Sequence, residues 1–180
     1  TVSLSGDGGD EIFAGYNRYV EGLNTWSSLN KIPKSIRHTF ARSMVSISPH
    51  IWDQCFSLVK NLLPKKFRFT APGDKIHKLA GVMFEDTLHS YYERLCSHWL
   101  DPEEIVLGSK EYTSLLSLDK EWLDSSNFTE KMMAMDIRTY MSDDILVKVD
   151  RAAMACSLET RVPMLSKKLV QSAWSLSLDL

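Results

Sequence analysis

Apolar residues recur at helical spacing over most of this 180-residue chain, with polar residues between them. The spacing predicts helices over residues 10–23, 35–63 with a break near Pro49, 74–85, 87–96, 101–104, 111–123, 129–141, 143–155 and from 166 or 167 onward. Residues 2–5 and 158–165 lack the helical period and are predicted to be extended. The pattern therefore predicts a mainly α-helical chain.

Composition and charge narrow the class of protein. An apolar fraction of 44% can form the core of one domain. The 21 basic and 23 acidic side chains leave a net charge of −2, and no apolar run approaches the roughly 20 residues that span a bilayer. We therefore expect neither nucleic acid nor a membrane as a partner. Three widely spaced cysteines do not suit a disulfide framework, and they fit a reducing cytoplasm.

A glycine-rich turn with three carboxylates separates the first extended segment from the first helix. The turn reads Ser5-Gly6-Asp7-Gly8-Gly9-Asp10-Glu11. A strand, a glycine turn and a helix in this order present free backbone N–H groups to an anion. Because the turn has no lysine, a bound polyphosphate would need a divalent cation between its charge and the carboxylates. The alternative is an ordinary strand-to-helix connection without a ligand.

A second block with candidate chemistry follows a predicted N-cap at Ser142. The block reads Asp143-Asp144-Ile145-Leu146-Val147-Lys148-Val149-Asp150-Arg151-Ala152-Ala153-Met154-Ala155. Lys148 and Arg151 are three residues apart on a helix, so both side chains can point the same way. Either they act on the negative charge of a ligand, or they belong to a solvated helix face on which Asp144 pairs with Lys148. Farther on, Glu159 and Arg161 alternate on an extended segment, which predicts a structural ion pair.

Both blocks carry a family resemblance. Together with Phe13, Gly15 and Tyr16, the glycine-rich turn resembles the second nucleotide motif in the synthetase domain of glutamine-hydrolysing asparagine synthetases of the B type. Residues 143–155 with 158–163 resemble a later signature of the same domain. The resemblance implies that this mainly α chain is part of an α/β nucleotide-binding synthetase domain, Rossmann-like and of the adenine nucleotide alpha hydrolase type. Its parallel sheet would lie mostly upstream.

The resemblance also implies roles for individual residues. The nucleotide, ATP, would be bound by Ser5, Gly6, Gly8 and Gly9. The cation, Mg²⁺, would be held against the pyrophosphate by Asp10 and Glu11. The catalytic residues would be Asp7 near the acyl-adenylate, with Lys148 and Arg151 as cations. One segment departs from the family, because Pro163-Met164-Leu165-Ser166 stands where relatives usually have Pro-Phe-Leu-Asp.

The reaction implied by the resemblance is amide formation driven by ATP. The side-chain carboxylate of aspartate would be activated as an acyl-adenylate, and ammonia from a glutaminase domain would then displace AMP. Two alternatives stay open at this point. A related AMP-forming amidotransferase or cyclase would act on another carboxylate, and a non-catalytic helical module would serve only for docking.

The ends of the chain bear on its domain organisation. The chain starts at Thr1, in what reads as the middle of a strand, and residues 175–180 alternate between apolar and polar without a turn signal. We expect residues 1–180 to be a partial synthetase domain, truncated at its C-terminal end and inactive alone. The pyrophosphate loop and the glutaminase domain would lie upstream. The expected location is cytoplasmic, and a homodimer is left as the candidate assembly.

Overall fold

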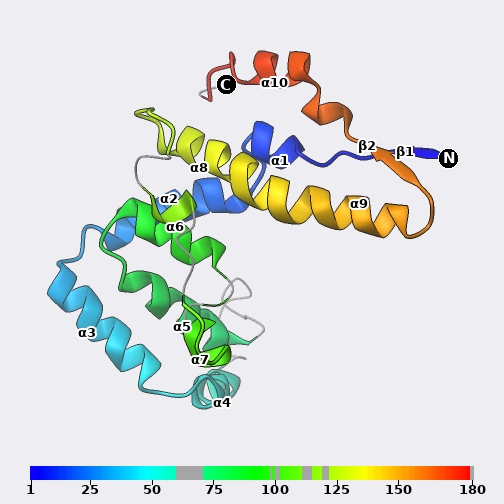
Figure 1. The fold of residues 1–180 in the computed structure, drawn as a ribbon. Helices are drawn as coiled ribbons and strands as arrows, with labels where there is room; N and C mark the ends of the chain where they lie inside the picture. The colour runs from blue at the N-terminus through cyan, green and yellow to red at the C-terminus, as the bar shows by residue number, and fades with distance from the viewer. Residues whose placement is uncertain (60–70, 98, 100–101, 111–114, 119–121, 179–180) are drawn as a thin grey trace. The chain divides into compact units, whose positions relative to one another are not determined.

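The computed structural model describes residues 1–59, 71–97, 99, 102–110, 115–118 and 122–178, and it is mostly helical (Figure 1). The chain forms two compact units. The first consists of residues 1–23 and 111–180, and the second of residues 24–110. Within the described residues, no helix is long and apolar enough to cross a membrane.

The first unit contains the two strands found in the described residues. Its elements are β1 (Val2–Leu4), α1 (Gly9–Ile12), the start of α2 (Asn17–Leu29), η2 (Leu115–Ser117), α8 (Phe128–Asp136), η4 (Ile137–Ile145), α9 (Leu146–Met154), β2 (Glu159–Arg161), η5 (Pro163–Leu165) and α10 (Lys167–Ala173). β1 and β2 pair in parallel, with Val2 opposite Glu159 and Leu4 opposite Arg161. The pairing brings together two segments that lie far apart in the sequence. The predicted mainly α chain is confirmed, and the described residues add a small parallel sheet to it.

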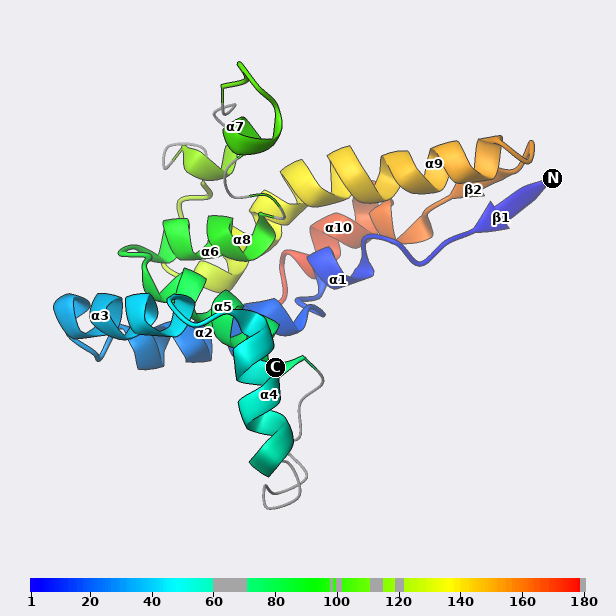
Figure 2. The ribbon, with the colours of Figure 1, turned by 90° about the horizontal axis from the view of Figure 1, so that it is seen from below.

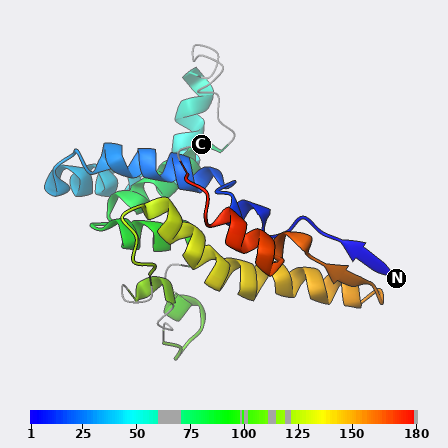
Figure 3. The same cartoon turned by 90° about the horizontal axis from the view of Figure 1, so that it is seen from above.

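α8, η4 and α9 form one continuous helix from Phe128 to Met154, and α1 and the two strands lie along one side of it (Figures 2 and 3). The predicted break at Ser142 is wrong. Ser142 lies inside η4, a π-helical segment, and its Oγ donates to the carbonyl of Arg138 at 2.9 Å. A serine that bonds back to a carbonyl four residues earlier stays compatible with a helix, so it does not act as an N-cap here.

The predicted helix over residues 10–23 is interrupted. α1 ends at Ile12 and α2 begins at Asn17, with Ala14 between them in the left-handed region at φ 55°. The backbone N–H of Gly15 donates to the carbonyl of Asp10 at 2.9 Å, and the Asp10 side chain occupies the space that a Cβ on Gly15 would need. Gly15 therefore permits this tight reversal, and a larger residue would not.

The core of the first unit is rich in methionine. Met132, Met133 and Met135 on α8 are buried, and so is Met141 on η4. Ile12 on α1 and Tyr19 on α2 are also buried, and α1 contacts both α8 and η4. Unbranched methionine side chains can fill an irregular space between short elements, and this packing fixes α1 against the long helix.

The second unit is a small helical bundle. It comprises the rest of α2, α3 (Lys34–Val45), α4 (Pro49–Val59), α5 (Pro72–Met83), α6 (Leu88–Cys96) and α7 (Pro102–Ile105). The break near Pro49 and the helices predicted over 74–85 and 87–96 are confirmed, with Thr87 capping α6 through the Ser90 N–H. The helix predicted over 101–104 is confirmed from residue 102 on, whereas residue 101 and residues 60–63 of the helix predicted after Pro49 lie outside the described residues. The predicted helix over 111–123 lies partly outside the described residues, and its described part at Leu115–Ser117 is a short 3₁₀ helix.

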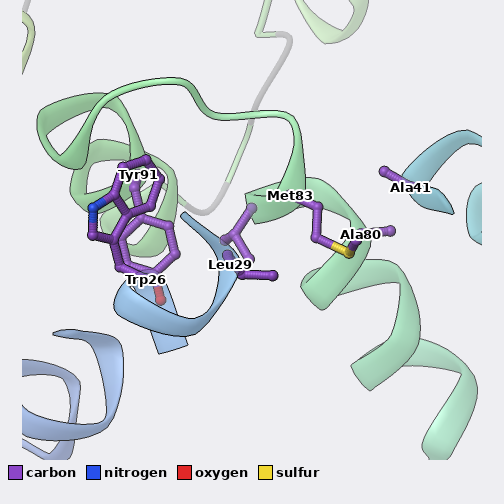
Figure 4. Close-up of a cluster of buried hydrophobic side chains, with 7 residues drawn as sticks. Trp26, Leu29, Ala41, Ala80, Met83 and Tyr91 are labelled. Carbon is purple, nitrogen blue, oxygen red and sulfur yellow. The ribbon is translucent and has the colours of Figure 1, made fainter. Parts of the chain in front are cut away.

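The core of the second unit forms around α2, α5 and α6. Trp26 packs against Tyr91, and Met83 lies beside Ala80 (Figure 4). The ring centroids of Trp26 and Tyr91 are 5.2 Å apart. Arg37 is buried at the edge of this core. Its guanidinium donates to the carbonyl of Glu85 at 2.6 Å and to the carboxylate of Asp86 at 3.1 Å. The unit therefore carries an ion pair of its own, between a buried arginine and a partly exposed aspartate.

Candidate functional site

The glycine-rich turn leaves the carboxyl end of β1 and leads into α1. The backbone N–H of Ser5 donates to the carbonyl of Arg161 at 2.9 Å, which continues the parallel pairing one residue beyond β1. The turn therefore lies beside the carboxyl end of β2 as well. In open α/β sheets, ligands bind outside the carboxyl ends of the strands, so the turn occupies the usual position for a ligand.

Gly8 is the residue on which the shape of the turn depends. Its φ of 83° is in the left-handed region, where a side chain is strained. A Cβ at this position would also collide with the Leu165 side chain of η5 and lie 3.5 Å from the sulfur of Met141. Gly9 is less restricted, because its Cβ would be 3.7 Å from the Met164 methyl, and Gly6 has open space around it. The backbone of the turn thus packs directly on η5 and η4 through Gly8.

The three carboxylates of the turn have different surroundings. Asp7 is partly buried, and it accepts a short hydrogen bond from the Ser5 hydroxyl within the turn itself. Asp10 is exposed and lies in the first turn of α1. Glu11 is only 1% exposed, and its carboxylate accepts a hydrogen bond from the Tyr16 hydroxyl at 2.7 Å. Of the two residues predicted to hold a metal ion, one therefore faces solvent and the other faces the protein interior.

Behind Glu11 lies a buried polar network that the sequence analysis did not predict. Asp136 is 1% exposed, and its Oδ2 accepts from the Arg18 guanidinium at 2.5 and 3.2 Å and from the Tyr19 hydroxyl at 2.5 Å. The Arg18 guanidinium also lies over the rings of Tyr16 and Tyr140, at 4.2 and 5.0 Å from their centroids. The available signal was a charged residue, Asp136, at the end of the methionine-rich apolar helix.

The hydroxyls of this network are held in their protonated form. Burial raises the pKa of Tyr16, and the hydrogen bond to the nearby Glu11 carboxylate raises it further. Burial likewise raises the pKa of Tyr19, followed by the charge and the hydrogen bond of Asp136. Both hydroxyls therefore serve as hydrogen-bond donors to carboxylates, and neither is poised to act as a base near neutral pH.

Lys148 and Arg151 lie on α9, which packs against β2 in the same unit as the turn. Both side chains are exposed, Arg151 by 81%, and the Arg151 Nε is 3.9 Å from the Asp150 carboxylate. Among the ion pairs of the described residues, the pair of Asp144 with Lys148 that belongs to the alternative of a solvated helix face does not form. Glu159 and Arg161 do pair, at 2.8 Å, as the sequence predicts. Within the described chain, neither Lys148 nor Arg151 makes a hydrogen bond or ion pair with residues 5–11.

The described residues contain no group of three or more histidine, cysteine, aspartate or glutamate side chains that could hold a metal ion. A metal enclosed by protein ligands is thus not supported among them. One exposed carboxylate at the turn, that of Asp10, suits a cation that arrives with a phosphate ligand. The arrangement can accept an anion and its counter-ion, with two exposed cations on the neighbouring helix.

Comparison with known proteins agrees with this architecture. The sequence model of the asparagine synthase family matches residues 1–180. "Asparagine synthetase [glutamine-hydrolyzing] 1" of Bacillus subtilis (strain 168) is 30% identical over 169 residues, which is 93% of this chain and 23% of that protein.

Two mycobacterial proteins are also similar. The "Putative asparagine synthetase [glutamine-hydrolyzing]" of Mycobacterium bovis and that of Mycobacterium tuberculosis are each 28% identical over 171 residues, again covering 93% of this chain. The chain spans 23% of the length of these curated relatives, and no solved structure matches it. The family match over the whole chain identifies it as a member of the asparagine synthase family.

Proposed function

We propose that this chain is part of an ATP-dependent asparagine synthetase that amidates the side-chain carboxylate of aspartate with glutamine-derived ammonia. The observation that carries the proposal is the glycine-rich turn at the carboxyl end of β1, closed onto η5 and η4 through the left-handed Gly8. Membership of the family and the names of the similar proteins support the same reaction. AMP and pyrophosphate would be the other products.

The turn would bind the nucleotide mainly through its backbone. We assign contact with the nucleotide to Ser5, Gly6, Gly8 and Gly9, because the glycines let a phosphate approach the backbone closely. The Ser5 N–H already donates to the Arg161 carbonyl and the Gly9 N–H to the Gly6 carbonyl, so the open backbone at Gly6 would make the first contact. The Ser5 hydroxyl already bonds Asp7, so the two side chains would act together at the edge of the site. Asp7 would then lie near the activated carboxylate.

A magnesium ion fits the donor set of the turn. Mg²⁺ in nucleotide sites commonly uses one or two protein carboxylates, together with water and phosphate oxygens. Asp10 is the exposed carboxylate and would be its direct ligand. Glu11 is buried on the Tyr16 hydroxyl, so we propose that it supports the turn from behind, and that any metal contact it makes requires a change of conformation. The bound ion would neutralise the phosphate charge.

Lys148 and Arg151 would contribute positive charge from α9. Their exposed side chains have several rotatable bonds and can reach a ligand without breaking an internal ion pair of Lys148. Charge builds up on the phosphate oxygens as the carboxylate attacks the α-phosphorus and again when ammonia displaces AMP. We assign the main electrostatic role to Lys148 and a secondary one to Arg151.

An assay of ATP consumption with different carboxylic acids tests the proposal. It uses the intact protein, by which we mean the full-length protein that contains residues 1–180. Pyrophosphate release should require ATP, Mg²⁺ and aspartate together, and asparagine should form when glutamine or ammonia is added. Release that depends on a different carboxylic acid would favour the related amidotransferase or cyclase. The absence of ATP binding by the intact protein would favour the non-catalytic helical module.

The domain organisation is proposed on the same grounds. Since the chain spans 23% of the length of its relatives, residues 1–180 would be a partial synthetase domain that needs an upstream pyrophosphate loop for activity. The isolated chain should therefore release no pyrophosphate where the intact protein does. The homodimer stays a prediction, which sedimentation of the intact protein tests.

A further inference from the structure

We infer that Asp136 and Arg18 form a positioning pair that holds the acidic turn, residues 7–11, in the orientation needed to bind the magnesium nucleotide. The inference rests on the proposed function. Asp136 is the last residue of α8, directly before η4, and is 118 residues from Arg18 in sequence. The pair therefore joins the segment after the turn to the long helix that carries Lys148.

Only one of the two oxygens of the Asp136 carboxylate accepts hydrogen bonds within the described residues. Its Oδ2 accepts three hydrogen bonds, two from Arg18 and one from Tyr19, while its buried Oδ1 has no partner among the described residues. A buried carboxylate is costly unless a charge and hydrogen bonds compensate it, so Arg18 is strongly bound here. The position of the guanidinium is thereby fixed by the long helix.

Arg18 is connected to the acidic turn by the aromatic ring of Tyr16. Its guanidinium lies 4.2 Å from the centroid of Tyr16, whose hydroxyl donates to Glu11 at 2.7 Å. Glu11 is buried and is the neighbour of Asp10, the proposed metal ligand. Tyr140 of η4 closes the other side, with its ring centroid 5.0 Å from the guanidinium and 6.2 Å from that of Tyr16.

The other end of the turn is attached to the same π-helical segment. Gly8 faces Leu165 and Met141, and Met141 follows Tyr140 in η4. The turn is thus held at Gly8 by packing and at Glu11 by the chain of contacts that ends at Asp136. η4 continues directly into α9, the helix that carries Lys148. Both attachments therefore fix the position of the turn's carboxylates relative to that helix.

Arg18→Met and Tyr16→Phe in the intact protein test the inference. Groups behind a metal ligand commonly change metal affinity by about 10–100-fold. We expect Arg18→Met to raise the Mg²⁺ concentration for half-maximal MgATP binding, measured by calorimetry, by about tenfold or more. Tyr16→Phe keeps the ring, removes only the hydroxyl bonded to Glu11, and should shift the midpoint in the same direction by less.

Hydrogen exchange supplies a readout that is independent of the ligand. Without Mg²⁺ or ATP, both variants should increase amide exchange in residues 7–15 selectively, because α1 loses its attachment. The matched control is Arg37→Met, which removes the buried ion-pair arginine of the second unit. It should lower overall stability and leave the exchange at 7–15 and the Mg²⁺ midpoint unchanged.

The results separate this inference from the proposed function. Unchanged exchange at 7–15 in a folded Arg18→Met or Tyr16→Phe protein would overturn the positioning role, and so would equal effects of Arg37→Met. If the unmodified protein binds no MgATP, the proposed function fails, and the exchange measurement still decides whether Arg18 holds the turn. If Arg18→Met does not fold, Tyr16→Phe carries both measurements.

Discussion

Replacing Gly8 with alanine should destabilise the protein through two separable effects. An alanine at φ 83° costs about 1–2 kcal/mol relative to an ordinary conformation. Its Cβ would also collide with the Leu165 side chain, and forced overpacking typically costs about 1–3 kcal/mol. The expected loss in the free energy of unfolding is therefore about 2–5 kcal/mol.

Urea unfolding of the intact protein, followed by circular dichroism, measures this loss. Gly6→Ala is the matched control, because Gly6 has no positive φ and no heavy atom lies within 4 Å of the position that an alanine Cβ would take. Its stability should change by less than about 0.5 kcal/mol. A Gly8→Ala protein as stable as the Gly6→Ala control would refute the reasoning.

A double variant separates the two contributions. In a Leu165→Ala background the collision is removed and the backbone strain remains, so adding Gly8→Ala should cost only about 1–2 kcal/mol. An equal cost of Gly8→Ala with and without Leu165 would show that the packing contact does not limit this position. MgATP binding, measured on the folded variants, should weaken most in Gly8→Ala alone.

Three further predictions concern charge. Asp10→Asn should abolish pyrophosphate release at ordinary Mg²⁺ and keep the circular dichroism spectrum, because Asp10 is exposed and a hard cation prefers a charged oxygen; an unchanged Mg²⁺ dependence of turnover would contradict this. Lys148→Ala should lower kcat by about 10²–10³-fold with a smaller change in KM for ATP, and Arg151→Ala should lower kcat by less. A normal kcat in Lys148→Ala with a lowered kcat in Arg151→Ala would reverse the assignment. Because the pKa of Tyr19 is raised in the folded state, its contribution to stability is present below the ordinary pKa of 10.0 and is lost at higher pH. Urea midpoints measured between about pH 9 and about pH 11.5 should therefore fall less steeply in Tyr19→Phe, and parallel profiles would argue against the assignment.

Local signals in the sequence predict most of the helices, and they fail where a helix boundary depends on a tertiary contact. Pro49 and Thr87 mark the boundaries of α4 and α6 correctly, because a proline and a capping side chain act through neighbouring residues. Ser142 looks like a similar boundary, but its hydroxyl bonds within the helix. The break after α1 depends on how Asp10 folds over Gly15, which apolar spacing does not report.

The candidate site likewise has features that the sequence predicts and features that only the fold shows. The glycines and carboxylates of the turn are recognisable from the sequence, because they are contiguous and their chemistry is unusual. The reason why Gly8 must be glycine depends on Leu165, far away along the chain. The pairing of Arg18 with Asp136 and the burial of Glu11 likewise require the fold, so the sequence assigns Glu11 and Asp10 the same role although their surroundings differ.

Isotope transfer tests the proposed reaction most directly. The intact protein would be incubated with ATP, Mg²⁺, ammonia and aspartate labelled with ¹⁸O in its side-chain carboxylate. If that carboxylate attacks the α-phosphorus and ammonia then displaces AMP, one labelled oxygen stays on the phosphate of AMP. Mass spectrometry should find this label in AMP, with none in pyrophosphate. Asparagine formation with unlabelled AMP would contradict the account, and ADP with labelled inorganic phosphate would show attack at the γ-phosphorus instead.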